Sequence, residues 1–421
     1  MIDWLLDRSS DPAIRWQVQR DLLDAPAEEW RAERSRVAFE GWGARLLALG
    51  DEDGPWAGGA CFPAGHRWGE GDGQPWTSTH PTLSLLREFG LDPAPERVQQ
   101  TITGIGAACR WEHDGQPYWE GEVEPCINGL TVANGAYFGV DMAPLATRLA
   151  GERMGDGGWN CEAENGSIRS SFDSTICVLE GLLEYERVTG GTAESREARS
   201  TGEEYLLERR LFRRLTTGEP AQAKYLRLLH PNWWHYDVLR GLDYFRSASF
   251  VAGRPADPRV GEAVEHVRSR RRDDGTWALD ERPPGKVWFE VDDGPGEPSR
   301  WVTLRALRVL RWWDGAGPAE LPPDAGSREG GGPDTLLRSF DERETTGSSE
   351  SQRKGFRGDG GVVRAGLRVP RRGGGRRRAG RSVGRAPCRG SASLCVRAPV
   401  ARLRRPRGGA RAGAPRGLAL R

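Results

Sequence analysis

Four side chains near the middle of the sequence are of the types that bind zinc. Asp173 and Cys177 are four positions apart in a stretch with helical periodicity, so both side chains can face the same point. His235 and Asp237 stand where a further helix is expected to begin. Together they offer carboxylate, thiolate and imidazole, which zinc accepts. The alternative is that Cys177 is a small core residue and Asp173 a helix cap, which requires no metal.

A second candidate site is a group of acids before the last expected helix. Glu290, Asp292 and Asp293 lie in one four-residue segment. Clustered carboxylates resist joint ionisation, so one of them could hold a proton at a raised pKa and act as a catalytic acid. The surrounding segment is rich in glycine and proline, and acids in such loops are usually solvated, which is the alternative interpretation.

An aromatic run, Trp233-Trp234-His235-Tyr236, contains one of the zinc candidates. The faces of aromatic rings stabilise cations, so the run could support a carbocation. Tryptophan packing in a helical core explains the same residues equally well. The sequence has no phosphate-binding loop, no Gly-x-Ser-x-Gly and no His-Glu-x-x-His, and it contains only three lysines.

The elements that would position these residues are helices. Asp11-Pro12 is a favoured helix start, and apolar residues recur every four positions after it. Similar apolar stripes run through 170–185 and 301–313, and in the second segment arginines recur every three positions. The alternating Val, Ile and Thr runs typical of strands are almost missing. The sequence therefore predicts an all-α fold.

A short motif recurs after the expected helices: an Asp-Gly turn followed closely by a tryptophan. The copies are Asp53-Gly54-Pro55-Trp56, Asp114-Gly115 with Trp119, Asp156-Gly157-Gly158-Trp159 and Asp274-Gly275-Thr276-Trp277. Glycine permits the left-handed conformation that ends a helix, and the tryptophan is expected to fill the space beneath the turn. Helices are expected to begin after these turns, near Thr79, Ile127, Ser171, Trp234 and Ser299. Such repeats predict helical hairpins that close their core against their neighbours.

The composition divides the chain into parts. All 17 tryptophans lie between Trp4 and Trp313. Residues 351–421 hold 21 of the 61 basic residues and one of the 60 acidic residues, so this tail carries +20 and the rest of the chain −19. We expect a helical domain in residues 1–314, a disordered linker in 315–350, and a basic low-complexity tail in 351–421.

The Arg/Gly/Ala/Pro-rich tail has three interpretations. Residues 371–421 contain 16 Arg, 10 Gly, 9 Ala and 4 Pro, the types with GC-only codon stems, which favours a frame-shifted or unselected extension. The second interpretation is an authentic disordered tail, and the third is an arm that binds nucleic acid through arginine. Aromatic residues are not interleaved with the arginines, so we do not expect nucleic acid as a partner.

Targeting signals are not evident. The N-terminus has neither a basic region nor an apolar run, and no stretch approaches the ~20 apolar residues of a membrane-spanning helix. The seven cysteines are irregularly spaced and include no Cys-x-x-Cys, so reduced thiols are the default. We expect a cytoplasmic protein, and contact with a membrane surface stays open.

The helical part resembles the superfamily of terpenoid cyclases and protein prenyltransferases. It is most similar to bacterial proteins described as squalene-cyclase-like or prenyltransferase-like. The resemblance rests on the segments 11–23 and 297–307 and on the repeated turns, and it covers about residues 1–314. It implies an α/α toroid of about five helical hairpins around a cavity that binds or transforms an isoprenoid or another apolar small molecule. The alternative is a non-catalytic toroid that serves as a scaffold for a protein partner.

The resemblance also implies where a site would lie. Helix starts would line one mouth of the cavity, where their N–H groups would favour an anion such as a diphosphate. The substrate-binding candidates are His80, Asn128, Trp234, Tyr236, Arg300 and Trp301, with Thr79 and Cys126 beside them. Ordinary helix capping explains many of these positions as well.

Two departures from the superfamily leave open whether the protein is an enzyme. Its cyclases protonate the substrate with an Asp-x-Asp-Asp motif, and the closest approach here is the segment 290–293. Its prenyltransferases bind zinc through Asp, Cys and His, which here would be Asp173, Cys177, His235 and Asp237, although the Asp-x-Cys spacing is absent. The cofactor is therefore undefined, with zinc as the one candidate.

Overall fold

The computed structural model describes residues 1–52, 54–67 and 73–315, and all of them belong to one compact unit. Helices dominate this part of the chain, and its only β pairing consists of isolated bridges, so the predicted all-α class is confirmed. The predicted linker beyond Gly315 and the predicted tail in 351–421 lie outside the described residues.

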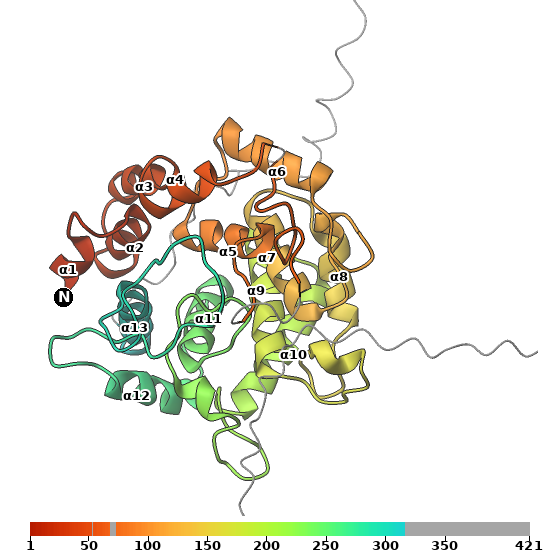
Figure 1. The fold of residues 1–421 in the computed structure, drawn as a ribbon. Coiled ribbons are helices and arrows are strands. Elements are labelled where there is room, and N and C mark those ends of the chain that lie inside the picture. Colours follow the sequence, from red (N-terminus) through yellow and green to blue (C-terminus); the bar gives the residue numbers. More distant parts are fainter. Residues whose placement is uncertain (53, 68–72, 316–421) are drawn as a thin grey trace, which may run out of the picture. The chain divides into compact units, whose positions relative to one another are not determined.

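The longer helices fall into an inner and an outer set (Figure 1). The inner helices are α2 (Pro12–Leu22), α5 (Thr79–Phe89), α7 (Pro125–Tyr137), α9 (Phe172–Thr189), α11 (Val238–Ala252) and α13 (Arg300–Trp313). The outer helices are α3 (Ala27–Ser35), α4 (Gly41–Ala48), α6 (Glu96–Ala108), α8 (Ala143–Gly151), α10 (Ala193–Glu208) and α12 (Gly261–Ser269). Short elements are α1 (Ile2–Leu6) and the 3-10 turns η1 (Arg36–Ala38), η2 (Tyr118–Glu120), η3 (Cys161–Ala163), η4 (Ala223–Leu226) and η5 (Pro258–Val260).

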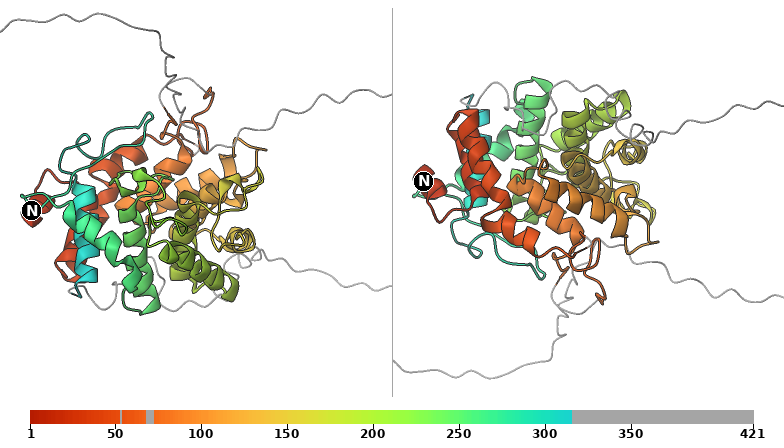
Figure 2. Two further views of the ribbon diagram at one scale, coloured as in Figure 1. Left: turned by 90° about the horizontal axis from the view of Figure 1, so that it is seen from below. Right: turned by 90° about the horizontal axis from the view of Figure 1, so that it is seen from above.

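The inner helices contact one another in succession. α2 contacts α5, α5 contacts α7, α7 contacts α9, α9 contacts α11, and α11 contacts α13. α13 in turn contacts α2. Both views of Figure 2 show α13 beside α2, in cyan and red. Glycines let the most extensively packed pair, α7 and α9, approach closely: a Cβ atom at Gly181 would lie 2.2 Å from the carbonyl oxygen of Gly129. The buried core therefore runs through all the inner helices.

The predicted helix starts agree with the structure at four of five places. α5 begins at Thr79, α7 at Pro125, α9 at Phe172 and α13 at Arg300. The exception is α11, which was expected near Trp234 and begins at Val238. Asp237 is the reason, since its carboxylate accepts the Arg240 N–H and caps the helix.

Three of the repeated tryptophans make the same hydrogen bonds. Each indole N–H donates to the main-chain carbonyl ten residues earlier, in the last turn of an outer helix. These bonds join Trp56 to Leu46 at 2.8 Å, Trp159 to Leu149 at 2.8 Å and Trp277 to Val267 at 2.7 Å. The main-chain N–H of the same tryptophans donates to Thr79, Thr175 and Thr303 hydroxyls of the next inner helices at 3.0, 3.1 and 3.0 Å. The motif thus ties α4 to α5, α8 to α9 and α12 to α13.

The copy at Asp114-Gly115 differs from these three. Trp119 is only partly buried and lies against Gly106 of α6, whereas the ring that is fully buried here is Tyr118. The indole of Trp111 donates to the carbonyl of Tyr118 at 2.8 Å. Trp119, expected beneath this turn, is therefore not the fully buried ring of this copy, because Tyr118 is.

The threonine in the motif gives a testable prediction. Thr303→Val keeps the shape of the side chain but leaves the buried N–H of Trp277 without its acceptor, which should lower the free energy of unfolding by about 1–3 kcal/mol. Urea denaturation of the full chain measures the change. Thr103→Val on the exposed face of α6, where the hydroxyl bonds only to the Gln99 carbonyl of its own helix, is the matched control and should change stability by less than about 0.5 kcal/mol. Equal effects of the two variants would contradict the role given to Thr303.

Candidate functional site

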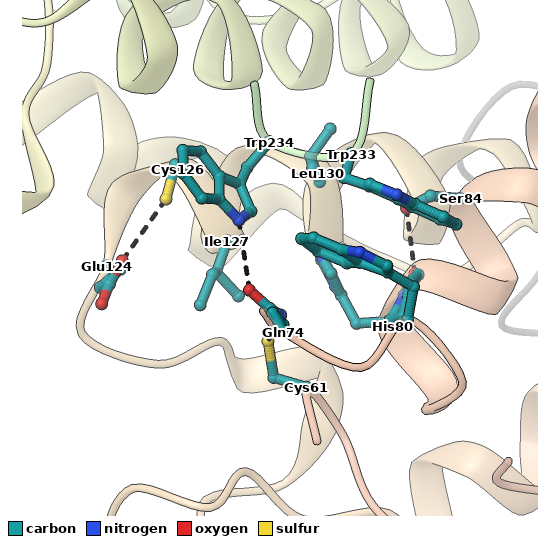
Figure 3. Close-up of a pocket in the computed structure, with 12 residues that line it drawn as sticks. Cys61, Gln74, His80, Ser84, Glu124, Cys126, Ile127, Leu130, Trp233 and Trp234 are labelled. Carbon is teal, nitrogen blue, oxygen red and sulfur yellow. Dashed lines mark hydrogen bonds between the residues drawn. The ribbon is translucent and has the colours of Figure 1, made fainter. Parts of the chain in front are cut away.

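A small pocket lies at the N-terminal ends of α5 and α7, next to the segment that precedes α11 (Figure 3). Its walls are largely apolar, and three indoles contribute to them: Trp76 and Trp233 stack at 5.0 Å between ring centres, and Trp234 lies nearby. Ile127 and Leu130 of α7 complete the apolar side. The enclosed volume is about 30 Å³, enough for about one water molecule.

The two tryptophans before α11 are held by specific contacts. The indole N–H of Trp234 donates to Gln74 Oε1 at 3.2 Å, and its ring stacks on His235 with centres 3.7 Å apart. Trp233 has a φ of 50°, a left-handed conformation that is uncommon for a bulky residue, and its carbonyl accepts from Arg240 at 3.0 Å. Strained backbone of this kind is concentrated at functional sites.

His80 supplies a neutral polar group to the pocket. Its Nδ1 lies 3.1 Å from the Tyr118 hydroxyl, and the side chain is buried in the first turn of α5. Burial, aided by the positive charge of Arg87, lowers the pKa of His80 to about 3. The imidazole is therefore uncharged at neutral pH and can donate or accept one hydrogen bond.

This shift predicts a pH dependence of stability. In the unfolded chain His80 takes up a proton below pH ~6.5, whereas in the folded protein it resists protonation down to about 3, so its stabilising contribution is present above pH ~6.5 and declines as the pH falls. Between pH 7 and 5 the loss should be about 2 kcal/mol, and His80→Gln should remove it. Tyr118→Phe should keep the pH dependence, because the imidazole stays buried. An unchanged slope in His80→Gln, measured by urea denaturation at several pH values, would contradict the assignment.

One edge of the pocket carries two thiols and a carboxylate. Cys126 Sγ lies 2.8 Å from Cys161 Sγ and 3.5 Å from Glu124 Oε2. Glu124 is the N-cap of α7 and Cys126 its second residue, whereas Cys161 begins η3, two residues after Trp159. All three side chains are buried, with residue exposures between 3% and 5%. The hydroxyl of Ser174 lies 3.3 Å from Cys161 Sγ.

Further acidic groups surround these thiols. Glu122 accepts the N–H of Glu124 at 2.6 Å, and burial together with the Glu124 charge raises the pKa of Glu122 to about 7. Burial also raises the pKa of the Cys61 thiol well above its usual range, and Glu112, Glu122 and Glu124 add to the effect. The negative charge around these thiols therefore favours protonated side chains or a bound cation.

A larger, charged cavity lies among the same inner helices. Its volume is about 230 Å³. Each inner helix contributes, through Gln17 of α2, Glu88 of α5, Leu130 of α7, Glu180 of α9, Asp243 of α11 and Arg308 of α13. Two arginines of the stripe expected in 301–313 line this cavity: Arg305 pairs with Glu88 at 2.7 Å, and Arg308 pairs with Asp243.

The four residues suggested for zinc do not form a metal site. Asp173 accepts the Tyr236 N–H at 2.7 Å and the Tyr225 hydroxyl at 3.1 Å. Burial raises the pKa of Cys177 to about 12, which disfavours its thiolate. His235 stacks on Trp234 and Asp237 caps α11, as described above. The group of three metal-ligating side chains that the described residues bring together is instead Glu124, Cys126 and Cys161.

The three suggested catalytic acids point to different partners. Glu290 pairs with Arg282 at 2.6 Å, and Asp293 is exposed. Asp292 accepts the Ser299 hydroxyl and the N–H of Arg300 at 3.0 Å, so it helps to cap α13. Burial raises the pKa of Asp292. A proton shared by all three carboxylates is not compatible with these separate partners.

Of the suggested substrate-binding residues, His80 and Trp234 line the pocket. Asn128 instead holds the loop before α7, accepting the Glu122 N–H and donating to the Glu122 carbonyl, both at 2.8 Å. The hydroxyl of Tyr236 donates to the Leu211 carbonyl at 2.6 Å in the core. These two residues shape the surroundings without reaching the pocket.

The two candidates at the start of α13 also lie elsewhere. Trp301 is buried and stacks on His230 with ring centres 4.8 Å apart. Arg300 lies over the Trp4 ring at 4.6 Å and donates to Ser10 at 2.8 Å. Arg300 therefore joins the start of α13 to the N-terminal segment, and Trp301 does so through its stacking on Trp42 at 6.1 Å between ring centres.

Several residues of the site were not predicted from the sequence. Cys161, Glu124 and Trp76 were not singled out, and Cys126 was noted only as a neighbour of the helix-start candidates. A signal existed for Cys161, because it follows a repeated Asp-Gly-Trp turn by two residues. Its proximity to Cys126, 35 positions earlier, could not be inferred without the packing of α7 against α9.

Comparisons with known proteins do not add an assignment. The chain matches no family model. No curated protein is significantly similar to it. Within the described residues, none of the helices has the length and apolar character needed to span a bilayer.

Proposed function

We propose that the protein is an α/α toroid that binds an apolar small molecule of the isoprenoid type in the tryptophan-lined pocket. The closed succession of contacts between the inner helices supports the toroid. The observation that carries the ligand proposal is the pocket lining, in which Trp76, Trp233 and Trp234 face a space with a few polar groups at its ends. Apolar walls with few, precisely placed polar groups are typical of small-molecule sites.

The pocket must enlarge to take such a ligand. Its enclosed volume of about 30 Å³ is far smaller than an isoprenoid chain. The indole of Trp234 is the side chain best placed to move, because it is only partly buried and is held by one hydrogen bond and one stacked ring. Displacement of this indole would connect the pocket to its surroundings and leave Trp76 and Trp233 as a flat apolar wall.

A binding experiment tests this proposal. Titration of the full chain with farnesol should give saturable quenching of tryptophan fluorescence. Ile127→Trp fills the pocket and should weaken the binding at least about tenfold. Ile168→Trp, at a position 85% exposed, is the matched control and should bind as the unmodified chain does. Non-saturable quenching, or equal binding by both variants, would overturn the proposal; circular dichroism verifies that each variant is folded.

The second candidate is a non-catalytic toroid that serves as a scaffold for a protein partner. The ion pairs in the larger cavity among the inner helices favour it, because they keep that cavity polar and unsuited to an apolar chain. A chain that binds no farnesol but co-purifies with one partner in a fixed ratio would support this function instead. Whether the protein catalyses a reaction stays a separate question under either proposal.

A further inference from the structure

We propose that Glu124, Cys126 and Cys161 form a zinc-binding site at the edge of the tryptophan-lined pocket. The site rests on its own geometry and not on the proposed apolar ligand, so either proposal can fail without the other. Its ligand atoms come from the start of α7 and from η3, and all lie within 4.8 Å of one another.

The donor types match zinc. Two thiolates and one carboxylate are ligands that zinc prefers, and three protein ligands with one open position are typical of zinc sites that do chemistry. Around tetrahedral zinc a sulfur and an oxygen ligand lie about 3.6 Å apart. The distance from Cys126 Sγ to Glu124 Oε2 is 3.5 Å, close to that value.

The two sulfurs need a small adjustment. They lie 2.8 Å apart, longer than the ~2.05 Å of a disulfide and shorter than the ~3.8 Å between two thiolates on one tetrahedral zinc. Small rotations of the two side chains would supply the difference. Zinc would bind the carboxylate of Glu124 as well as both sulfurs, whereas a disulfide would join the two sulfurs alone.

Burial and charge also fit a divalent cation. Exposures of 3–5% at all three residues exclude a solvated surface cluster. Binding of Zn²⁺ would release the protons of both thiols to solvent, and two thiolates with one carboxylate would then carry −3 against +2. Because Glu124 and Cys126 also line the pocket, the ion would border the space in which a ligand binds.

Metal analysis of the full chain, purified under reducing conditions and exposed to Zn²⁺, tests the site. We expect about one zinc per chain, and thiolate-to-metal charge-transfer absorption when Co²⁺ replaces zinc. Cys126→Ser and Cys161→Ser should each weaken zinc binding at least about 100-fold, since loss of a ligand exceeds the effect of losing an outer partner. Cys109→Ser, a buried thiol outside the group, is the matched control and should bind zinc as before.

A measurement on the unmodified chain covers the case in which a serine variant does not fold. At a urea concentration that partly unfolds the chain and exposes the thiols, zinc should slow the alkylation of Cys126 and Cys161, read by peptide mass spectrometry, more than that of Cys109. The proposal is overturned if the reduced chain binds no zinc at micromolar concentration, or if zinc leaves the alkylation of both cysteines unchanged. It is also overturned if the two cysteines form a disulfide that mild reductant does not reduce in the presence of added zinc. Equal loss of zinc binding in Cys109→Ser and in the other two variants would overturn it as well.

Discussion

Trp159→Ala is expected to lower the free energy of unfolding by about 3–5 kcal/mol. The indole is 0% exposed, and its removal leaves a cavity between α8, α9 and α10. The truncation also leaves the carbonyl of Leu149 without its donor. The indole packs so closely against α10 that only a glycine fits beside it, since a Cβ atom at Gly202 would lie 2.6 Å from the indole ring. Urea denaturation of the full chain measures the loss.

The irregular copy of the motif provides the control. Trp119→Ala removes the same number of atoms from a partly buried site and should cost clearly less than Trp159→Ala. Trp159→Phe should fall between the two, because it keeps most of the ring but loses the bond to Leu149. Equal losses in Trp159→Ala and Trp119→Ala would show that the shared hydrogen-bond pattern has no special role in stability.

Asp243→Asn is expected to cost about 3–5 kcal/mol at pH 7, because it removes a counter-charge shared by two buried guanidinium groups, which then keep only Asp21 nearby. Asp243 binds both Arg308 and Arg246, and the side chains of these arginines are 11% and 6% exposed. Burial alone would raise the pKa of Asp243, but the two arginines outweigh it and hold the pKa well below its usual range. The carboxylate is therefore charged in the folded protein at all ordinary pH values.

The sign of the pH effect follows from that depressed pKa. The stabilisation by Asp243 is fully present above the pKa of an unfolded aspartate, near 4, and is lost as the pH falls below it. The gap between Asp243→Asn and the unmodified chain should therefore narrow below pH ~4. Asp314→Asn, which breaks an exposed pair with Arg268, should cost at most about 1 kcal/mol. Similar costs for the two variants would contradict the buried network.

The repeated turns carried most of the fold information in the sequence. Trp56, Trp159 and Trp277 were recognisable from a local pattern, and each of them joins one outer helix to the next inner helix. The start of α11 was misplaced because this unit lacks the Asp-Gly turn, and the capping by Asp237 is a weaker signal. Local capping and periodicity therefore predict where helices begin more reliably than how an irregular segment connects them.

The site was predicted less well than the fold. His80 and Trp234, both expected at one mouth of the cavity, line the same pocket, whereas other residues at helix starts only cap a helix or pack in the core. Asp173 has a favourable spacing to Cys177, yet the N–H of Tyr236 takes its carboxylate. The arginine stripe of α13 was visible in the sequence, whereas its acidic partners come from α5 and α11 and become neighbours only in the folded chain.

A crystal structure of the full chain grown with farnesol is the most direct test of the proposed ligand site. We predict ordered ligand against Trp76 and Trp233, with the indole of Trp234 displaced from Gln74. Ligand bound elsewhere, or an unchanged pocket in which Trp234 still donates to Gln74 at saturating farnesol, would contradict the proposed function.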